Sequence, residues 1–200
     1  MTKPPPRRRL DPAARRDEIL DAAAAMVMAD GVSAVSMEAV ARAAGISKAL
    51  VYNYFSSRST LLSALLRRTV ACFEAEGAAA AASAGDFVDL VRATTRAYLA
   101  HVATHGVLIQ RLLREPAVAS TIEADEASRR MTADFFARAI TREYGTPPAR
   151  AATIAAILMG LTGGAGDLLH RTGADVDAVT DLTVAMLLAA IAAVSTRGPA

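Results

Sequence analysis

The chain has 200 residues, of which 53% are hydrophobic and 21% charged, and its formal net charge is +2. That composition supplies enough apolar material for a folded core and excludes wholesale disorder. Aromatic residues are scarce and alanine, the strongest intrinsic helix former, makes up about a quarter of the chain, so an all-β fold is excluded and an all-α fold is expected.

Positive charge is concentrated at the start of the chain. The first 16 residues hold six basic side chains and one acidic side chain, and the prolines up to Pro12 prevent a helix before about Ala13. We therefore expect a flexible basic arm over residues 1–12. Arg7, Arg8 and Arg9 would suit phosphates or a minor groove, although a solvated tail is the simpler interpretation of the arm taken alone.

Three short helices are predicted after the arm. Apolar residues recur at helical spacing from Ala13 to Asp30, and Gly31 is suited to end that helix. Ser36 is a good N-cap for a second helix that Gly45 ends, and Ser47 is a good N-cap for a third. Two short helices joined by a tight, glycine-containing turn form a helix-turn-helix, whose second helix, Lys48–Tyr54, fits a major groove.

Longer helices are predicted in the rest of the chain. Thr60–Glu76 is amphipathic, the alanine-rich residues 77–85 either extend it or form a loop, and Asp86 is expected to cap the helix that follows. The remaining helices, with breaks at Gly106, Pro116, Gly145 and Gly173, are Phe87–His105, Val107–Arg114, Val118–Tyr144, Pro148–His170 and Val176–Ser195. The total is about nine helices, with no strand of convincing alternation and no internal repeat.

The last two predicted helices carry apolar residues on nearly every side. A soluble helix without a polar face needs cover on both sides, so a second copy of the chain is the expected cover. The glycines Gly160, Gly163, Gly164 and Gly166 would permit close approach of two helices, or would equally kink this one.

The sequence also bears on location and on cysteine chemistry. The longest apolar run without a charge, Ala151 to Gly166, has 16 residues and falls short of the roughly 20 that span a bilayer. The first ten residues lack the apolar segment of a secretory signal, so a cytoplasmic location without membrane contact is expected. Cys72, the single cysteine, excludes an intrachain disulfide and a thiolate zinc cage, and is expected to be buried.

Many ordered positions at fixed spacing run through the three short helices. They are Ile19-Leu20-Asp21-Ala22-Ala23, Gly31, Ser36, Val40-Ala41, Ala44-Gly45-Ile46-Ser47-Lys48, Tyr52-Asn53-Tyr54-Phe55, Ser57-Arg58 and Leu61-Leu62. This pattern, over about residues 15–65, resembles the N-terminal DNA-binding domain of TetR-family (tetracycline-repressor-like) transcriptional regulators. Two positions depart from it: Val27 replaces a common aromatic residue and Arg58 a common lysine.

The chemistry of the third helix agrees with this resemblance. Lys48 could reach guanine or a phosphate, Asn53 could pair with adenine, and Ala49 and Leu50 could press on a thymine methyl. The resemblance implies that Tyr52 and Tyr54 hold phosphates. The expected DNA contacts are Ser36, Ser47, Lys48, Ala49, Leu50, Tyr52, Asn53, Tyr54, Arg58, Arg7, Arg8 and Arg9, whereas Phe55 is expected in the core.

The resemblance also implies a small-molecule effector that changes the spacing of the two recognition helices in a homodimer and so weakens operator binding. Candidate effector residues combine an apolar stripe with a few polar groups: Tyr98, His101, Val102, His105, Met131, Phe135 and Met159, with Phe136 as a further wall. The expected function is a ligand-responsive regulator, most commonly a repressor in this family. We expect a basic arm over 1–12, a helix-turn-helix domain over 13–58 and an effector-binding and dimerisation domain over 59–200.

Two alternatives stay open. His101 and His105, four residues apart, have the helical spacing of two metal ligands, so an all-α metal-binding protein or enzyme is the first alternative, without a third ligand fixed by a motif. An architectural DNA binder without an effector is the second. No nucleophile elbow, P-loop, dinucleotide or paired-carboxylate motif is present, so no catalytic residue, cofactor or metal is expected.

Overall fold

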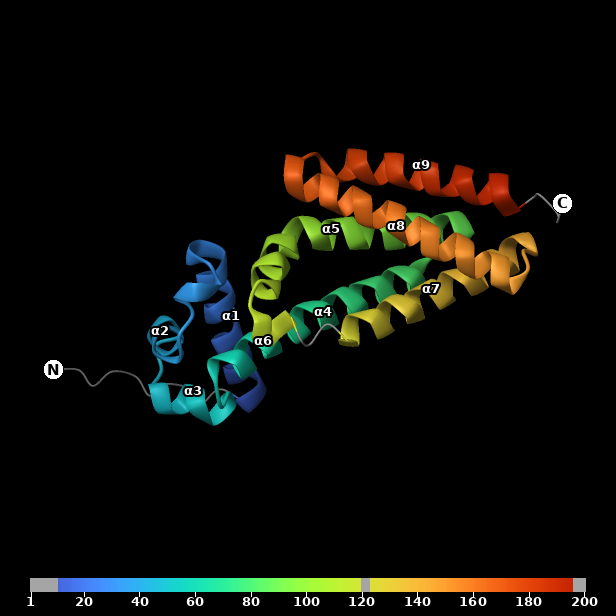
Figure 1. Cartoon of the computed structure of the whole chain (residues 1–200). Helices are drawn as coiled ribbons and strands as arrows, with labels where there is room; N and C mark the ends of the chain where they lie inside the picture. Colours follow the sequence, from blue (N-terminus) through green and yellow to red (C-terminus); the bar gives the residue numbers. More distant parts are fainter. Residues whose placement is uncertain (1–10, 120–122, 196–200) are drawn as a thin grey trace. The chain divides into compact units, whose positions relative to one another are not determined.

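A computed structural model describes residues 11–119 and 123–195, and all regular structure in these ranges is helical. The α-helices are α1 (Pro12–Asp30), α2 (Met37–Ala43), α3 (Lys48–Tyr54), α4 (Arg58–Ser83), α5 (Phe87–Leu113), α6 (Pro116–Ala119), α7 (Glu123–Tyr144), α8 (Pro148–Thr172) and α9 (Val176–Ser195), with a 3-10 turn at Val32–Ala34 (Figure 1). The expected all-α fold is confirmed.

The chain divides into two compact units. The N-terminal unit comprises the described residues up to Arg67 together with Arg111–Ala119, and the C-terminal unit comprises Arg68–Gln110 and the described residues after Ala119. The division lies within α4, beyond the domain boundary that we expected at residue 58. The expected domain limits therefore stay a prediction.

The N-terminal unit is built around the short helices. Ile19, Leu20, Ala23 and Val27 form the buried face of α1, as their spacing predicted, and Val40 of α2 is fully buried. Fully burying a side chain of this size stabilises the fold by about 1.5–3 kcal/mol. Contacts join α1 to α2 and α2 to α3.

The C-terminal unit is a layered bundle in which α8 packs on both α7 and α9. Figure 1 shows α8 and α9 running side by side at one face of this unit. Its core combines side chains from four helices: Phe87 and Val91 from α5, Ala137, Ala139 and Ile140 from α7, Ala151, Ile154 and Ala155 from α8, and Val184, Leu187 and Ile191 from α9.

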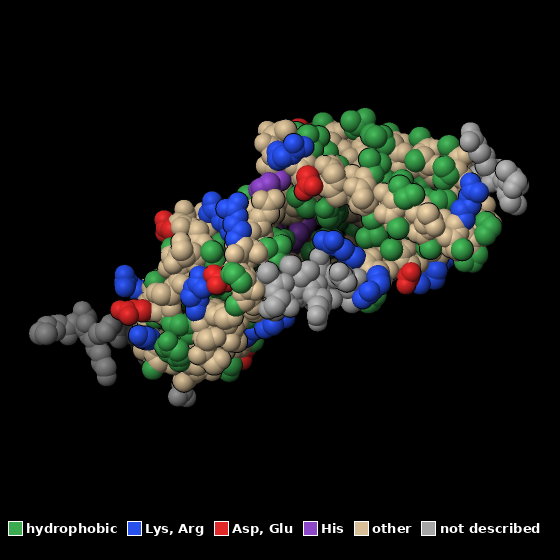
Figure 2. Space-filling model, viewed as in Figure 1, with side chains coloured by type: hydrophobic (Ala, Val, Ile, Leu, Met, Phe, Trp, Pro, Cys, Tyr) green, Lys and Arg blue, Asp and Glu red, His purple; other side chains and the backbone are tan. Residues whose placement is uncertain are grey.

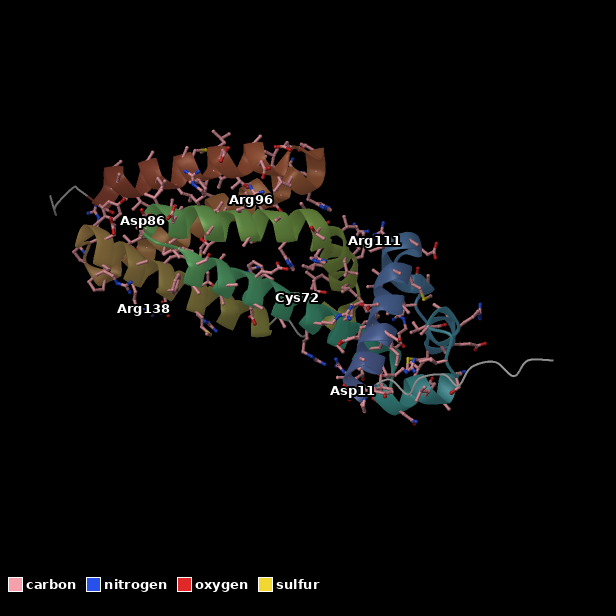
Figure 3. The ribbon with its side chains drawn as sticks, turned by 180° about the vertical axis from the view of Figure 1, so that it is seen from behind. Asp11, Cys72, Asp86, Arg96, Arg111 and Arg138 are labelled. Carbon is pink, nitrogen blue, oxygen red and sulfur yellow. The ribbon has the colours of Figure 1, made fainter. Side chains whose placement is uncertain are left out.

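Four sequence-based expectations about helix limits and burial need correction or completion. Residues 77–83 extend α4 rather than form a loop, since alanine favours the helix. Gly106 does not divide α5, because a glycine inside a helix costs only about 1 kcal/mol relative to alanine and the long helix continues through it. The predicted helix Val118–Tyr144 is instead α6 and α7. Cys72 is exposed on α4, where Figure 3 labels it, and is not a core residue.

The expected helix caps are present. Ser36 Oγ accepts a hydrogen bond from the Ala39 N–H at 3.1 Å, and Ser47 Oγ accepts one from the Leu50 N–H at 3.2 Å. Asp86, labelled in Figure 3 at the start of α5, accepts one from the Asp89 N–H at 2.8 Å. Each cap satisfies a backbone donor that the first helical turn leaves without a partner.

The last two helices expose much of their apolar surface in a single chain. By length and composition alone α8 and α9 could each cross a membrane, yet only 17% and 33% of their most apolar windows are buried. Two such helices are weak evidence for a membrane span, since only their length and composition select them. Gly166 is buried against Tyr98, whereas a Cβ added at Gly160, Gly163 or Gly164 would meet no atom of the described chain within 4 Å.

Candidate nucleic-acid interface and effector region

The turn between α2 and α3 determines how α3 is presented. The Ile46 N–H donates to the Ala41 carbonyl at 2.9 Å and the Gly45 N–H donates to the Arg42 carbonyl at 3.2 Å, which is the Schellman arrangement. Gly45 has a φ of 64°, a left-handed conformation that glycine adopts without cost. Ser47 then caps α3 two residues later, so the chain reverses within four residues.

Replacing a glycine by alanine should change the free energy of unfolding in opposite directions in this turn and inside α4. Gly45→Ala should lower the free energy of unfolding by about 1–2 kcal/mol, because alanine resists the left-handed conformation. Gly77→Ala, inside α4 with no atom within 4 Å of the added Cβ, should raise it by up to about 1 kcal/mol. Urea denaturation followed by circular dichroism would measure both, and a Gly45→Ala variant as stable as the wild type would contradict the role given to the turn.

Helix α3 has a buried inner face and an exposed outer face. Val51 and Phe55, at its inner side, are buried, as expected for Phe55, and the Arg16 guanidinium lies 5.1 Å from the Phe55 ring centroid. The predicted contact residues Lys48, Ala49, Tyr52 and Asn53 are exposed, as are Ser36 and Ser47, while Leu50 and Tyr54 are half-buried. The structure thus brings the α3 residues to one accessible surface, which we call the α3 face.

The α3 face is not neutralised by strong ion pairs. Lys48 Nζ lies 3.7 Å from Glu38 Oε2, and both side chains are more than half exposed. An exposed pair at that distance is worth at most about 1 kcal/mol and is screened by salt, so Lys48 can exchange Glu38 for a phosphate or a base.

Arg58 has a structural role that the sequence did not indicate. Its guanidinium donates to the Val35 carbonyl at 2.8 Å and to the Val32 carbonyl at 2.9 Å, and it pairs with Glu115 at 3.0 Å. These partners occupy a half-buried guanidinium and tie α4 to the 3-10 turn and to the segment before α6. The predicted DNA contact of Arg58 stays a prediction, and Arg7, Arg8 and Arg9 lie outside the described residues.

Arg111 and Glu115 were missed by sequence reasoning as well. The Arg111 Nη1 donates to the carbonyls of Val27 and Met28, both at 2.6 Å, at the carboxyl end of α1, where a cation is favourable. Figure 3 labels Arg111 near the end of α5. Its partners are more than 80 residues away in the chain, so no local pattern could have revealed them.

The predicted effector residues fall into two groups in the C-terminal unit. His101 is buried, and Tyr98, Val102, His105 and Met159 are half-buried. Met131, at 72% exposed, and Phe135, at 39%, lie on the surface of the single chain, whereas α7 turns the neighbouring Phe136 toward the core. The role of Met131 and Phe135 as pocket walls stays a prediction.

His101 lies at the centre of a cluster of aromatic rings. Its ring centroid is 5.2 Å from that of Phe73 and 4.6 Å from that of His105, and Phe73 meets Tyr98 edge-on at 5.8 Å. His101 Nδ1 lies 3.0 Å from Glu76 Oε2 on α4, a partner that its sequence position did not suggest. Figure 2 shows a recess in the molecular surface with histidine and hydrophobic side chains beside it.

Burial governs the protonation of His101. Desolvation lowers the pKa of His101 below the ordinary 6.5, and neighbouring His105 lowers it further, while the hydrogen bond and charge of Glu76 oppose both. Between pH 6.5 and the lowered pKa the unfolded chain therefore binds the additional proton. The uncharged state of His101 in the folded protein therefore contributes fully to the free energy of unfolding above pH 6.5. This contribution is lost as the pH falls from 6.5 through the lowered pKa.

This sign gives a measurable prediction. The free energy of unfolding should decrease as the pH is lowered from 8 to 5, and His101→Gln should remove part of that decrease because the titrating ring is gone. Urea unfolding at several pH values would measure both, with His170→Gln as the matched control. A wild-type protein that becomes more stable on acidification through this window, relative to His101→Gln, would contradict the burial argument.

The metal-binding alternative gains no third ligand. Within residues 11–119 and 123–195, no group of three or more His, Cys, Asp or Glu side chains is placed to hold a metal ion. His101 and His105 are adjacent, as their spacing predicted, but their rings lie tilted against each other, and the His101 ring also contacts Phe73.

Comparison with known proteins matches part of the N-terminal unit to a known family. The family described as "Bacterial regulatory proteins, tetR family" matches residues 19–65. The HTH-type transcriptional regulator BetI of Rhizobium meliloti (strain 1021) is 43% identical over 53 residues, and the match spans 26% of this chain and 26% of that curated relative.

Solved structures extend the likeness to most of the chain. A TetR-like transcriptional regulator from Rhodococcus sp. RHA1 has a TM-score of 0.73 and 25% identity, covering 92% of this chain and 99% of its own. The SmeT–triclosan complex has a TM-score of 0.68 and 23% identity, covering 88% of this chain and 91% of its own.

Proposed function

Because the chain belongs to the TetR family of DNA-binding transcriptional regulators, we propose that it is a cytoplasmic, homodimeric repressor that a small molecule releases from its operator. The observation that carries the proposal is the coincidence of the family match over residues 19–65 with an exposed polar face on α3. Regulators of this family are not enzymes, and the proposal invokes no cofactor.

The α3 face supports sequence-specific binding. Lys48 and Asn53 can donate to base edges, Ala49 and Leu50 offer methyl groups for thymine, and the Tyr52 and Tyr54 hydroxyls suit phosphates. Ser36 and Ser47 use their hydroxyl oxygens as caps, yet each hydroxyl hydrogen remains able to donate to a phosphate oxygen.

The basic arm is proposed to add affinity without sequence preference. Removing residues 1–9 deletes Lys3, Arg7, Arg8 and Arg9, so operator binding should weaken and the slope of log Kd against log salt should fall by up to about 0.9 for each lost phosphate contact. Fluorescence anisotropy with labelled operator at several salt concentrations would measure this slope. An unchanged slope would mean that the arm does not touch DNA.

Dimerisation is proposed through α8 and α9. These helices expose the large apolar side chains Ile157, Leu168, Leu182, Met186 and Val194 in the single chain, and Figure 2 shows hydrophobic side chains gathered over them. A contiguous apolar patch of this kind marks an interaction site, and a twofold copy would cover it and present two α3 faces to successive major grooves.

An effector is proposed to act through linkage. A ligand that binds more tightly to the dimer state with the wrong α3 spacing must lower operator affinity by the same factor. SmeT, a structural neighbour, was solved in complex with triclosan, which supports the proposal that a protein of this fold can bind a small molecule.

Operator selection tests the proposal. Genomic fragments retained by the purified protein should converge on one sequence with two related half-sites, bound about 10³-fold or more tighter than unrelated DNA. Retention of all fragments alike would indicate an architectural DNA binder, and retention of none would reject DNA binding.

A further inference from the structure

Three buried side-chain polar atoms among the described residues of the C-terminal unit have no hydrogen-bond partner: Thr146 Oγ1, Ser195 Oγ and His101 Nε2, of which only His101 Nε2 lies among the candidate effector residues. The His101 side chain is 3% exposed, and its Nε2 forms no hydrogen bond with any described residue. Buried polar atoms of proteins are almost always paired, so an orphaned ring nitrogen at a candidate ligand region points to a group from outside the chain.

Glu76 determines what that nitrogen can do. A carboxylate oxygen only accepts hydrogen bonds, so the proton of the neutral imidazole resides on Nδ1, which donates to Glu76 Oε2 across 3.0 Å. Nε2 then carries a lone pair and is an acceptor. Burial, which lowers the pKa of His101, favours this uncharged ring.

The surroundings of His101 are mostly apolar and aromatic. The rings of Phe73 and His105 lie tilted against the His101 ring. Tyr98 fills the space that a side chain at Gly166 would need, because a Cβ there would stand 3.0 Å from the Tyr98 hydroxyl oxygen. Glycine at position 166 thus brings α8 close to α5. A ligand beside His101 would meet ring faces and edges, with one strong acceptor among them.

Resting on the proposed effector function, we infer that the effector is an uncharged, largely apolar molecule whose O–H or N–H group donates a hydrogen bond to His101 Nε2. Phenols and alcohols have this chemistry. An ionised carboxylate has no hydrogen to donate to Nε2, and its negative charge would lie near the Glu76 carboxylate. Anionic ligands are therefore disfavoured at this nitrogen.

A matched set of probes tests the donor. The probes are 4-pentylphenol, its methyl ether 4-pentylanisole, and 4-pentylbenzoate, which share one apolar body and differ in the polar group. In calorimetric titrations of the full chain at pH 7.5, 4-pentylphenol should bind about tenfold tighter than the ether, the value of one well-placed hydrogen bond to a buried acceptor. The benzoate should bind most weakly.

Two variants connect the preference to the named nitrogen. His101→Phe keeps an aromatic ring but removes the acceptor, so the phenol should lose its advantage over the ether while the ether keeps its affinity. His170→Phe, a matched change at a half-buried histidine of α8, should retain the full preference. Thermal melting establishes that each variant is folded.

Nitrogen-15 NMR of the wild-type histidines needs no variant. His101 should appear as the neutral tautomer with its proton on Nδ1, and the Nε2 resonance should shift when 4-pentylphenol is added but not with an equal amount of the ether.

Each contrary result overturns the inference. These results are equal affinities for phenol and ether, no measurable binding of the phenol, tighter binding of the benzoate, or a proton on Nε2. A parallel gel shift with selected operator separates this failure from failure of the proposed function. Operator binding that persists with any of these results rejects only the donor inference, whereas absence of operator binding rejects the DNA-binding role.

Discussion

Tyr52→Ala and Lys48→Ala are each expected to weaken operator binding strongly while leaving the fold unchanged. Tyr52 is 46% exposed and Lys48 forms only a long surface ion pair, so neither contributes to the buried core of the N-terminal unit. A good contact to a base or phosphate is worth about 1–3 kcal/mol. A homodimer loses two such contacts, so each change should cost about 2–6 kcal/mol, roughly 30-fold or more in affinity.

The two substitutions should differ in their salt dependence. If Lys48 binds a phosphate, its loss reduces the salt slope by about 0.9 for each copy, whereas loss of the uncharged Tyr52 leaves the slope unchanged. A slope unchanged by Lys48→Ala, together with relaxed preference at one base pair, would instead place Lys48 on a base.

Gel shift with selected operator, melting curves and analytical ultracentrifugation together measure these effects. Met28→Ala is the matched control, because Met28 is a 41% exposed large side chain of the same unit outside the α3 face. It should bind operator like the wild type. Wild-type affinity in both Tyr52→Ala and Lys48→Ala would refute the assignment of α3 as the recognition helix.

Leu182→Glu combined with Ile157→Glu is expected to convert the dimer into a monomer. These side chains of α9 and α8 are 65% and 67% exposed in the single chain, so a charge there costs little in a monomer. In a dimer through this surface, four carboxylates would be buried without partners. Such burial should weaken self-association on the order of 100-fold or more.

Operator binding should fall together with dimerisation, because a monomer reads one half-site and loses the gain from linking two. Met131→Glu is the matched control: Met131 is an apolar side chain of α7 that is 72% exposed and outside the surface of α8 and α9. Sedimentation velocity would measure both variants. If the double variant sediments as a dimer, the interface lies elsewhere, and flotation with lipid vesicles would then test whether α8 and α9 bind membranes.

Local physics made several helix starts and the turn before α3 predictable. Ser36, Ser47 and Asp86 cap helices because short polar side chains satisfy free backbone donors, and Gly45 makes the turn because it alone tolerates a positive φ at little cost. The same local information misjudged Gly106, since one interior glycine costs only about 1 kcal/mol and α5 continues through it.

Burial was less predictable than helix position. Cys72 is exposed and Met131 and Phe135 lie on the surface, although their residue types favour burial. Which apolar residue of a helix faces the core depends on where the neighbouring helices lie. In an alanine-rich helix such as α4, alanine occupies several faces, so the sequence does not indicate clearly which face is buried.

The amino-acid order alone determined the helical class, the capped turn that precedes α3 and the residues on its outer face, because these depend on interactions within a few positions of the chain. Only the tertiary structure paired Arg58 with Glu115, placed Arg111 at the end of α1 and joined His101 to Glu76. Such pairs join residues 25 to 84 positions apart, and only folding brings them within hydrogen-bond distance. The roles of His101 and Arg58 therefore became visible only once their distant partners were known.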